Sequence, residues 1–578
     1  MIKTLAGCVR EYKFPAIMSP VFVTLEVIMD VLIPLVMAKL IDFGIDAGDM
    51  NAVMKYGMIL VLCAVLTMTF GVASSTVASV ASVGFAKNLR KDMFDNVQRF
   101  SFSNIDKFSA ASIITRLTTD VNNVQNAFMM IIRIAARCPL MLVFSVVMAL
   151  SINVKITMVF IAVIPVLTVI LFGIIKIAFP MFEKVFKTYD KLNNVVRENI
   201  RGVRVVKAYV REDYEISKFK VISDKIFRDF SQAEKVVAFN APVMQLAVYT
   251  CMIGASWLGA KLIVGGSLTT GELVSIITYA MQILMSLMML SMIFVMLTLA
   301  RASAERDYEI LIEKPDIADG DNPVTEVADG SIEFRNVDFS YAGDMDKLCL
   351  SNVNLEIKSG EVVGIVGGTG SSKSTLVQLI PRLYDVTGGE ILVGGVNVKD
   401  YDMHALRNSV SMVLQKNVLF SGTVNENMRW GDPDASEEEI IKACETAQAG
   451  EFIREFPKGY ETYIDQGGTN VSGGQRQRLC IARALLKKPK IIIMDDSTSA
   501  VDTATDSKIR KAFREDLPDT TKIIIAQRIS SVEHADKIIV LEGGMINGIG
   551  THEELLESNE IYREAYTSQM KGGMGLGE

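Results

Sequence analysis

The 578-residue sequence predicts a membrane α-helical bundle of six transmembrane helices, fused to a cytoplasmic α/β domain of the phosphate-loop type. Half of the residues are hydrophobic and the mean hydropathy is +0.31, which is too apolar for an ordinary soluble protein. The apolar residues gather in long segments before residue 301, whereas short apolar runs alternate with helical segments from residue 331 onwards. These patterns predict a transmembrane domain at 1–305, a charged linker at 306–330 and a nucleotide-binding domain at 331–578.

Each of the six apolar segments contains at least the roughly 20 helical residues that cross a bilayer core. Lys and Arg gather in the connections 87–125 and 180–238, so the positive-inside rule places these connections, both termini and the α/β domain in the cytoplasm. The first segment is too long for a cleavable signal, and a multi-pass protein of the cytoplasmic membrane is expected. The predicted spans are 15–43, 57–86, 127–150, 155–178, 239–263 and 272–300.

Some charged residues lie deep within the predicted spans. Glu26 and Asp30 are four residues apart and share one helix face, and Arg133 and Arg137 repeat this spacing in the third span. Such charges face a bundle interior or water, either as contacts for a substrate or proton or as interhelical ion pairs. The sixth span is rich in Met, which predicts either a tolerant binding surface or ordinary packing. Its six Met are Met281, Met285, Met288, Met289, Met292 and Met296.

Charge and cysteine usage exclude other classes of protein. The net charge of −7 gives no case for nucleic-acid binding. The seven Cys are scattered without a C-x-x-C pair, which indicates neither a zinc site nor a disulfide framework.

A glycine-rich turn connects the apolar run 361–366, a predicted buried strand, with the predicted helix 376–380. Backbone N–H groups of such a turn point at one spot, which suits a phosphate group. Lys373 would reach the outer phosphates, and the Ser374 hydroxyl would bind Mg²⁺. Ser372 stands where the pattern G-x-x-x-x-G-K-[ST] has its second Gly. The predicted loop is Gly367, Gly368, Thr369, Gly370, Ser371, Ser372, Lys373, Ser374 and Thr375.

Two more stretches extend this site. A predicted buried strand at 491–494 ends in Asp495 and Asp496, and a carboxylate at such a strand end can hold Mg²⁺ beside a phosphate loop. The sequence VSGGQ precedes a helix predicted over 479–487 and forms a second phosphate-binding surface. Its polar and glycine residues are Ser472, Gly473, Gly474 and Gln475.

The order and spacing of the phosphate loop, Gln415, VSGGQ and IIIMDD resemble those of ABC transporters. Nearly the whole chain is similar to an exporter-type half with fused membrane and nucleotide-binding domains, including the loop ENIRGVRVVKAYVREDYE at 198–215. The resemblance implies ATP and Mg²⁺ as ligands. Tyr341 would stack on adenine, Gln415 would contact Mg²⁺ and sense the membrane domain, and Asp495 would be the Mg²⁺ carboxylate.

The resemblance also implies a head-to-tail dimer of nucleotide-binding domains. ATP would lie between the phosphate loop of one domain and the Ser-Gly-Gly-Gln of the other. Parts of the loops near 103–120 and 205–216 would be coupling helices that transmit closure of the dimer to the membrane bundle.

Three positions depart from the family pattern on the ATP-facing surface. Asp496 stands at the position of the catalytic Glu, where a shorter carboxylate lies farther from the attacking water, and a general base contributes about 10²–10⁴-fold. Gln527 stands at the position of the switch His, and an amide cannot accept and return a proton. Together with Ser372, they favour a degenerate site that binds ATP but hydrolyses little of it.

The intact VSGGQ can serve a phosphate loop that another chain supplies. The sequence therefore predicts an ABC-type transporter ATPase that is one subunit of a heterodimeric exporter, similar to bacterial multidrug exporters, with a non-identical half-transporter as partner. Hydrolysis at the composite site with the partner would drive export of small amphipathic molecules across the lipid bilayer. Two alternatives remain: a homodimeric exporter with Asp496 as base, and a nucleotide-gated regulatory subunit that transports nothing.

Overall fold

The computed structural model describes residues 1–496 and 501–574, so the end of the predicted domain 331–578 lies outside the described residues. The chain forms two compact units. Unit 1 comprises Met1–Gln98 and Ser109–Glu313, and unit 2 comprises Arg99–Phe108 and Lys314–Glu578. The predicted boundaries at residues 305 and 330 stay predictions.

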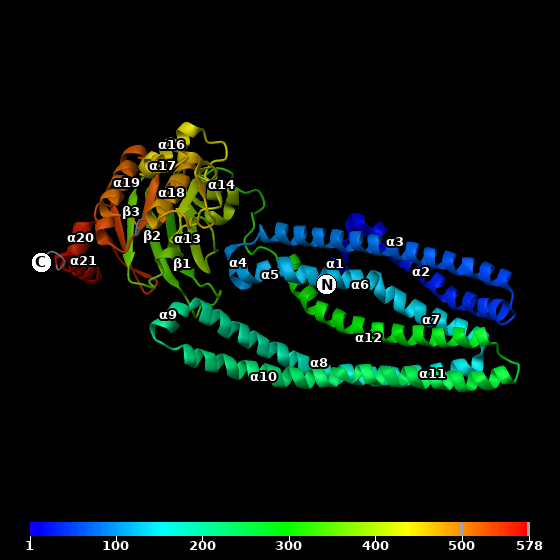
Figure 1. Cartoon of the computed structure of the whole chain (residues 1–578). Coiled ribbons are helices and arrows are strands. Elements are labelled where there is room, and N and C mark those ends of the chain that lie inside the picture. Colours follow the sequence, from blue (N-terminus) through cyan, green and yellow to red (C-terminus); the bar gives the residue numbers. More distant parts are fainter. Residues whose placement is uncertain (497–500, 575–578) are drawn as a thin grey trace. The chain divides into compact units, whose positions relative to one another are not determined.

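Unit 1 is built of long helices (Figure 1). Helix α2 packs on α3, α7 and α12, while α8 packs along α10 and α11. The helices are α1 (Ile2–Gly7), α2 (Lys13–Leu40), α3 (Met50–Val97), α5 (Ala110–Thr115), α6 (Val121–Ile132), α7 (Ile134–Ile152), α8 (Val154–Arg201), α9 (Val203–Ala208), α10 (Glu212–Ala238), α11 (Asn240–Val264) and α12 (Thr270–Ile312), with short turns η1 (Arg10–Tyr12), η2 (Ile41–Ile45) and η3 (Arg116–Asp120).

In the part of the chain that the structure describes, six helical segments are long and apolar enough to cross a membrane, and each contains one predicted span. Four of them begin at a side chain that accepts a hydrogen bond from the first turn: Asp49 before α3, Ser109 before α5, Asn153 before α8 and Thr269 before α12. The segments are Arg10–Ile45, Met50–Val97, Ala110–Ile152, Val154–Arg201, Glu212–Val264 and Thr270–Ile312.

Unit 2 combines strands and shorter helices. Its strands are β1 (Ile332–Phe339), β2 (Leu350–Ile357), β3 (Val362–Gly367), β4 (Gly388–Val393), β5 (Val396–Asn397), β6 (Val410–Val413), β7 (Gly422–Thr423), β8 (Tyr463–Ile464), β9 (Ile491–Asp495), β10 (Thr521–Ile525), β11 (Lys537–Glu542) and β12 (Met545–Gly550). Its helices are α4 (Phe102–Phe108), α13 (Lys373–Leu379), α14 (Met403–Ser409), α15 (Val424–Met428), α16 (Glu437–Thr446), α17 (Gly450–Glu455), α18 (Gly473–Leu486), α19 (Thr503–Asp516), α20 (His552–Ser558) and α21 (Glu560–Met574), with short 3₁₀ turns η4 (Val398–Asp400), η5 (Gly459–Glu461) and η6 (Ile529–Ser531).

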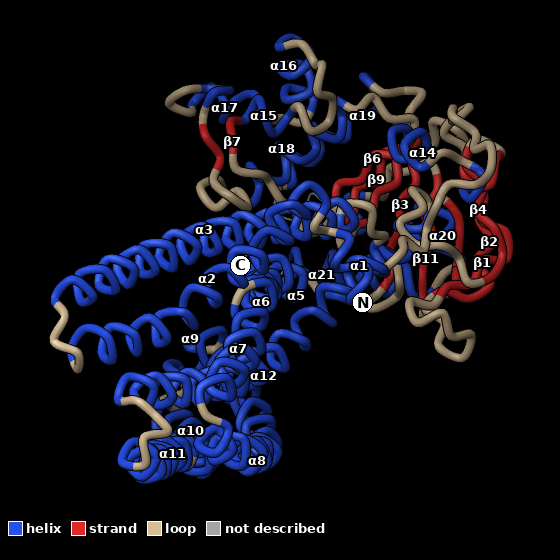
Figure 2. The backbone as a smooth tube through the Cα atoms, turned by 90° about the vertical axis from the view of Figure 1, so that its right-hand side faces the viewer, coloured by secondary structure: helices blue, strands red, loops and turns tan. Residues whose placement is uncertain are grey.

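The central sheet of unit 2 has the strand order β12-β11-β3-β10-β9-β6. Neighbouring strands from β11 to β6 run parallel, and β12 is antiparallel to β11. Every residue of β9 and β10 is buried, which explains the apolar runs at 491–494 and 523–525 within them. A second, antiparallel sheet has the order β2-β1-β4-β5, and α15, α16 and α17 lie to one side of the strands (Figure 2).

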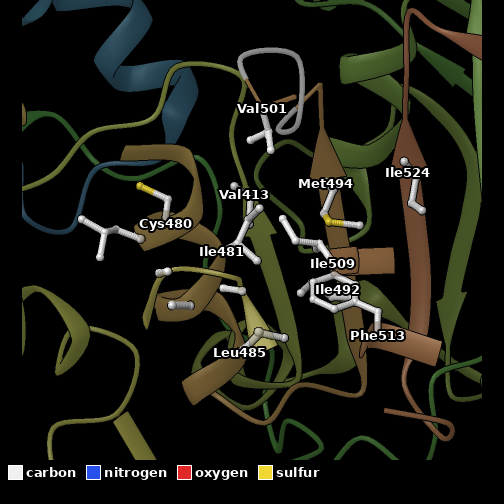
Figure 3. Close-up of a cluster of buried hydrophobic side chains, with 14 of the residues drawn as sticks. Val413, Cys480, Ile481, Leu485, Ile492, Met494, Val501, Ile509, Phe513 and Ile524 are labelled. Atoms are coloured by element: carbon white, nitrogen blue, oxygen red, sulfur yellow. The ribbon is translucent and has the colours of Figure 1, made fainter. Parts of the chain in front are cut away.

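Buried side chains on one face of the central sheet pack against α18 and α19 (Figure 3). Ile492 and Met494 of β9 contribute to this cluster with Ile481 of α18 and Phe513 of α19. Ile491 and Ile493 point to the opposite cluster, since alternate residues of a strand face opposite sides. The sheet is therefore held from both faces, and the carboxyl ends of β3 and β9 have fixed positions on either side of β10.

Candidate functional site

The glycine-rich loop follows β3, as the sequence predicts, but α13 begins at Lys373, three residues before the predicted helix 376–380 and within the predicted loop. A Cβ on Gly367 would come within 2.3 Å of the carbonyl oxygen of Leu541, so this position requires Gly. Ser372 lies in the left-handed region, with φ 68° and ψ 25°, a conformation that strains any residue with a side chain. Its side chain does not cap α13, so N–H groups at the helix start are left for another acceptor.

Lys373 lies against the loop that precedes it. Its Nζ donates hydrogen bonds to the carbonyl oxygens of Gly367 (3.0 Å) and Gly368 (2.8 Å). Burial lowers the pKa of Lys373, while the charges of Asp495 and Asp496 oppose this shift. The ammonium group is therefore near enough to interact with both carboxylates at the carboxyl end of β9, which is separated from β3 by β10.

Asp495 is the last residue of β9, and only 4% of its surface is exposed. Burial raises the pKa of this carboxyl, and a hydrogen bond with Ser374 opposes the increase. No group of three or more His, Cys, Asp or Glu that could hold a metal occurs among the described residues. Mg²⁺ is commonly bound by one or two carboxylates together with phosphate oxygens. The Asp495 carboxylate and the Ser374 hydroxyl beside it fit that kind of site.

Asp496 and Gln527 are directly bonded to each other. The Nε2 of Gln527 donates a hydrogen bond to Oδ2 of Asp496 at 2.8 Å. Burial raises the pKa of Asp496, and hydrogen bonds from Gln415 and Gln527 oppose this shift. The contact arises because β10 lies parallel to β9 with Ile525 opposite Asp495, so the residues that follow the two strands meet.

Asp496 also has a positive φ of 50°, and its backbone N–H donates to the carbonyl of Ile525 at 3.0 Å. A non-glycine residue in this region is strained, and such strain persists only where the surroundings hold it in place. The structure therefore brings six predicted site residues together: Lys373, Ser374, Gln415, Asp495, Asp496 and Gln527.

Gln569, which no sequence motif indicates, holds the loop that carries Gln527. The Oε1 of Gln569 accepts a hydrogen bond from the N–H of Ile529, and its Nε2 donates to the carbonyl of Gln527, both at 2.9 Å. A cavity of about 400 Å³ lies here, lined by Gly367, Gly368, Gln527 and Gln569 among others. Gln569 lies in α21 outside any motif, so only the fold could reveal it.

Tyr341 lies beside the phosphate loop, with its ring half exposed and its hydroxyl 3.0 Å from Oγ1 of Thr375. Its ring makes an edge contact with Tyr384 at 5.1 Å between centroids. The hydroxyl of Tyr384 donates to Oδ2 of Asp106 at 2.8 Å, and its ring contacts Phe102. Within unit 2, Tyr384 therefore connects the predicted adenine-stacking residue with α4, which falls in the predicted coupling region 103–120.

The polar and glycine residues of VSGGQ, at 472–475, lie at the start of α18 and are called the signature below. The hydroxyl of Ser472 accepts a hydrogen bond from the N–H of Gln475 (3.2 Å), and the Gln475 side chain accepts one from the N–H of Ser472 (2.9 Å). This capping box starts the helix at Gly473, whereas the sequence analysis began it at residue 479. Helix α18 packs on α15, α16 and β6. Ser472 and Gln475 lie at the start of α18, whereas the phosphate loop leads into α13.

The intramembrane charges are partly paired. Arg137 contacts Glu26 (3.1 Å) and Asp30 (2.7 Å). This confirms the interhelical ion pair among the two interpretations for these three residues. Arg133 is half-buried, and its side chain has no ion-pair or hydrogen-bond partner among the described residues.

Comparisons with known proteins agree with this arrangement. Residues 16–287 match the family model described as "ABC transporter transmembrane region", and residues 350–499 match the model described as "ABC transporter". An uncharacterized ABC transporter ATP-binding protein of Bacillus subtilis, YfiB, is 36% identical over 97% of each chain. The putative multidrug export ATP-binding/permease protein YgaD of the same organism is 34% identical over 83% of each chain. The solved structure of a bacterial Atm1-family ABC exporter with ATP bound has a TM-score of 0.84 at 24% identity, over 96% of this chain and 99% of that one, which shows a shared fold.

Proposed function

This chain belongs to the ABC transporters, with a transmembrane region and an ATP-binding domain of exporter architecture in one polypeptide, and we propose that it is one half of a heterodimeric exporter. Its own phosphate-loop site binds ATP and Mg²⁺ but hydrolyses little ATP, and its signature completes a competent site on a non-identical partner. The exported molecules are small, amphipathic and lipophilic, and they leave across the cytoplasmic membrane. The observation that carries the proposal is the hydrogen bond between Gln527 and Asp496.

This hydrogen bond lowers the basicity of Asp496, the carboxylate at the base position. Burial raises the pKa of Asp496, and donation from Nε2 of Gln527 opposes this increase because it occupies a lone pair and stabilises the charged form, so Asp496 accepts a proton less readily than it would without the amide. The amide itself cannot accept a proton and return it. A general base contributes about 10²–10⁴-fold, and the shorter Asp side chain reduces this contribution further.

The signature, in contrast, is ordered for use by another chain. The capping box fixes the Ser472 side chain at the start of α18, where its hydroxyl hydrogen remains able to donate. The first N–H groups of a helix attract phosphate oxygens. These features support a sound composite site opposite a partner's phosphate loop.

The tip of the second long cytoplasmic connection supports assembly with another chain. Helix α9 and the turn after it expose apolar side chains, including Val205 (60%), Tyr209 (74%) and Val210 (81%). No residue of α9 is buried within this chain. Exposed apolar side chains gathered at one place are typical of interaction sites, and α9 overlaps the predicted coupling region 205–216.

ATPase measurements test the proposal. The full-length chain, purified alone in nanodiscs, should bind a fluorescent ATP analogue with Mg²⁺ but turn over slowly, and Lys373→Ala should abolish the binding. The double change Asp496→Glu with Gln527→His should increase hydrolysis about tenfold or more. Asp496→Glu alone is the matched control, because it lengthens the base but leaves the amide in place.

The pairing is tested by co-expression with a non-identical ABC half-transporter from the same organism. The pair should hydrolyse ATP and transport substrate into vesicles, and Asp496→Asn in this chain should leave most of both activities. Rapid hydrolysis by the isolated chain that Asp496→Asn abolishes would support the homodimeric alternative and contradict the proposal. ATP binding without transport by the pair would support the regulatory subunit instead.

A further inference from the structure

A cavity of about 520 Å³ lies within the helical bundle of unit 1, between α7 and α12. Its volume falls in the range of about 300–1,000 Å³ that is usual for small-molecule sites. The side of α12 contributes Thr278, Met281, Gln282, Met285, Ser286 and Met289. Since these residues are spaced by three or four, they lie on one helix face.

The α12 face has an apolar stripe and a polar stripe. Met281, Met285 and Met289 recur every four residues, and their flexible thioethers adapt to varied apolar shapes. Thr278 and Ser286 are uncharged, and their hydroxyls donate hydrogen bonds to carbonyls of α12 itself. The wall formed by α12 is therefore neutral and mostly apolar.

The opposite wall is cationic. Arg133 and Arg137 line the cavity, and no carboxylate does so among the described residues. The carboxylates that neutralise Arg137, those of Glu26 and Asp30, are only 8% and 17% exposed, whereas the Arg137 side chain is 39% exposed. Both carboxylates are therefore buried behind Arg137 and neither of them lines the cavity.

Arg133 lies at an interruption between two helices. Helix α6 ends at Ile132 and α7 begins at Ile134, with φ −115° and ψ −67° at Arg133. The hydroxyl of Ser19 donates to the carbonyl of Ile132 at 3.3 Å, which satisfies an oxygen beside the break. An unpaired cation at membrane depth is unfavourable, so its place on a cavity wall indicates a partner from outside this chain.

We propose that this cavity binds an amphipathic anion, a carboxylate, sulfonate or phosphate on an apolar body. The anionic group pairs with Arg133, and the apolar body packs on the Met stripe of α12. The inference deepens the proposed function, on which it rests only in treating the bound molecule as transported cargo. The same chemistry describes an anionic lipid of the bilayer, and the experiment separates these two sources.

Ligand binding by the full-length chain tests the inference without nucleotide. The chain is placed in nanodiscs of neutral phosphatidylcholine, and three dansyl-labelled probes of equal chain length are titrated: an undecanoate, its methyl ester and the corresponding amine. The anion should bind best, and Arg133→Gln should weaken its binding about tenfold or more while changing ester binding less than about twofold. Arg133→Lys should retain most of the preference for the anion.

Lys261→Gln is the matched control. It also removes a positive charge from a membrane helix, but Lys261 lies over the ring of Trp257 and not in the cavity, so anion binding should be unchanged. Thermal unfolding of Arg133→Gln establishes that the variant is folded. Displacement of the probe by added phosphatidylglycerol would assign the site to bilayer lipid. If added phosphatidylglycerol does not displace the probe, the site is assigned to a free amphiphile.

Equal binding of the three probes, or an equal loss of anion binding in Arg133→Gln and Lys261→Gln, would overturn the inference. The ATPase comparison of Asp496 and Gln527 variants does not involve this cavity. Failure of anion binding with low ATPase activity of the isolated chain would therefore refute the inference alone.

Discussion

Replacing Ser372 by Gly should stabilise unit 2, because Ser372 is held in a conformation that favours Gly. A left-handed backbone costs a residue with a side chain about 1–2 kcal/mol. Gly recovers this energy but loses about 0.4–1 kcal/mol through the greater freedom of the unfolded chain. The Ser372 side chain makes no capping hydrogen bond that the change would remove. The expected net gain is about 0.5–1 kcal/mol.

The two Trp residues allow this gain to be measured in unit 2 of the intact chain. Trp257 lies in unit 1 and Trp430 in unit 2, so a Trp257→Phe background leaves Trp430, stacked on Phe420, as the reporter. A gain of this size shifts the thermal transition of a domain of 150–250 residues by about 1–4 °C. The increase should be visible as a higher midpoint of Trp430 fluorescence during heating.

Ser371→Gly is the matched control one residue earlier. Ser371 does not have a positive φ, and its hydroxyl donates to the carbonyl of Gly368 at 2.9 Å. Its replacement should lower the midpoint, since a hydrogen bond is lost and backbone freedom increases. A lower midpoint for Ser372→Gly as well would refute the reasoning that strain at this position opposes folding.

Three more predictions concern contacts around the site. Tyr384→Phe keeps the ring contacts but removes the hydrogen bond to Asp106, so amide hydrogen exchange of α4 should become faster, and unchanged exchange would mean that the bond adds nothing. Gln569→Leu removes both hydrogen bonds that hold the Gln527 loop, so exchange at residues 527–529 should increase while binding of an ATP analogue persists; Gln569→Glu, which keeps one acceptor, should give a smaller increase. Burial raises the pKa of Asp495, so its carboxyl becomes protonated at a higher pH than usual for Asp, and Mg²⁺-dependent strengthening of analogue binding should weaken as the pH falls, beginning above that usual range; Asp495→Asn should remove this pH dependence in the same titration.

Local patterns were sufficient for the elements and for the order of motifs. Predicted strands at 361–366 and 491–494 correspond to β3 and β9, because buried parallel strands are continuous apolar runs. The six apolar spans each lie within one long helical segment for the equally local reason of length and hydropathy. The predicted start of α18 at residue 479 is too late. Ser472 caps the helix, which therefore begins at Gly473 despite the two glycines that follow the cap.

The pairing of side chains could not be predicted in the same way. Asp496 and Gln527 are 31 residues apart, and they meet only because β9 and β10 are parallel neighbours in a fixed register. Arg133 and Arg137 carry the same side chain on one face of the predicted third span, so the sequence does not distinguish them. In the fold, only Arg137 packs within reach of Glu26 and Asp30. Strand register and helix packing depend on many contacts between residues that are distant along the chain.

The sequence alone determined the division into membrane helices and a phosphate-loop domain, the identity of the site residues and the three departures from the family pattern. These features depend on composition and on spacings of a few residues, which helix and strand geometry translate directly into faces and turns. The tertiary structure decided which groups bond within the site, which membrane arginine is neutralised and which one lines a cavity. Those outcomes depend on the distances between folded elements, and packing of the whole chain sets these distances.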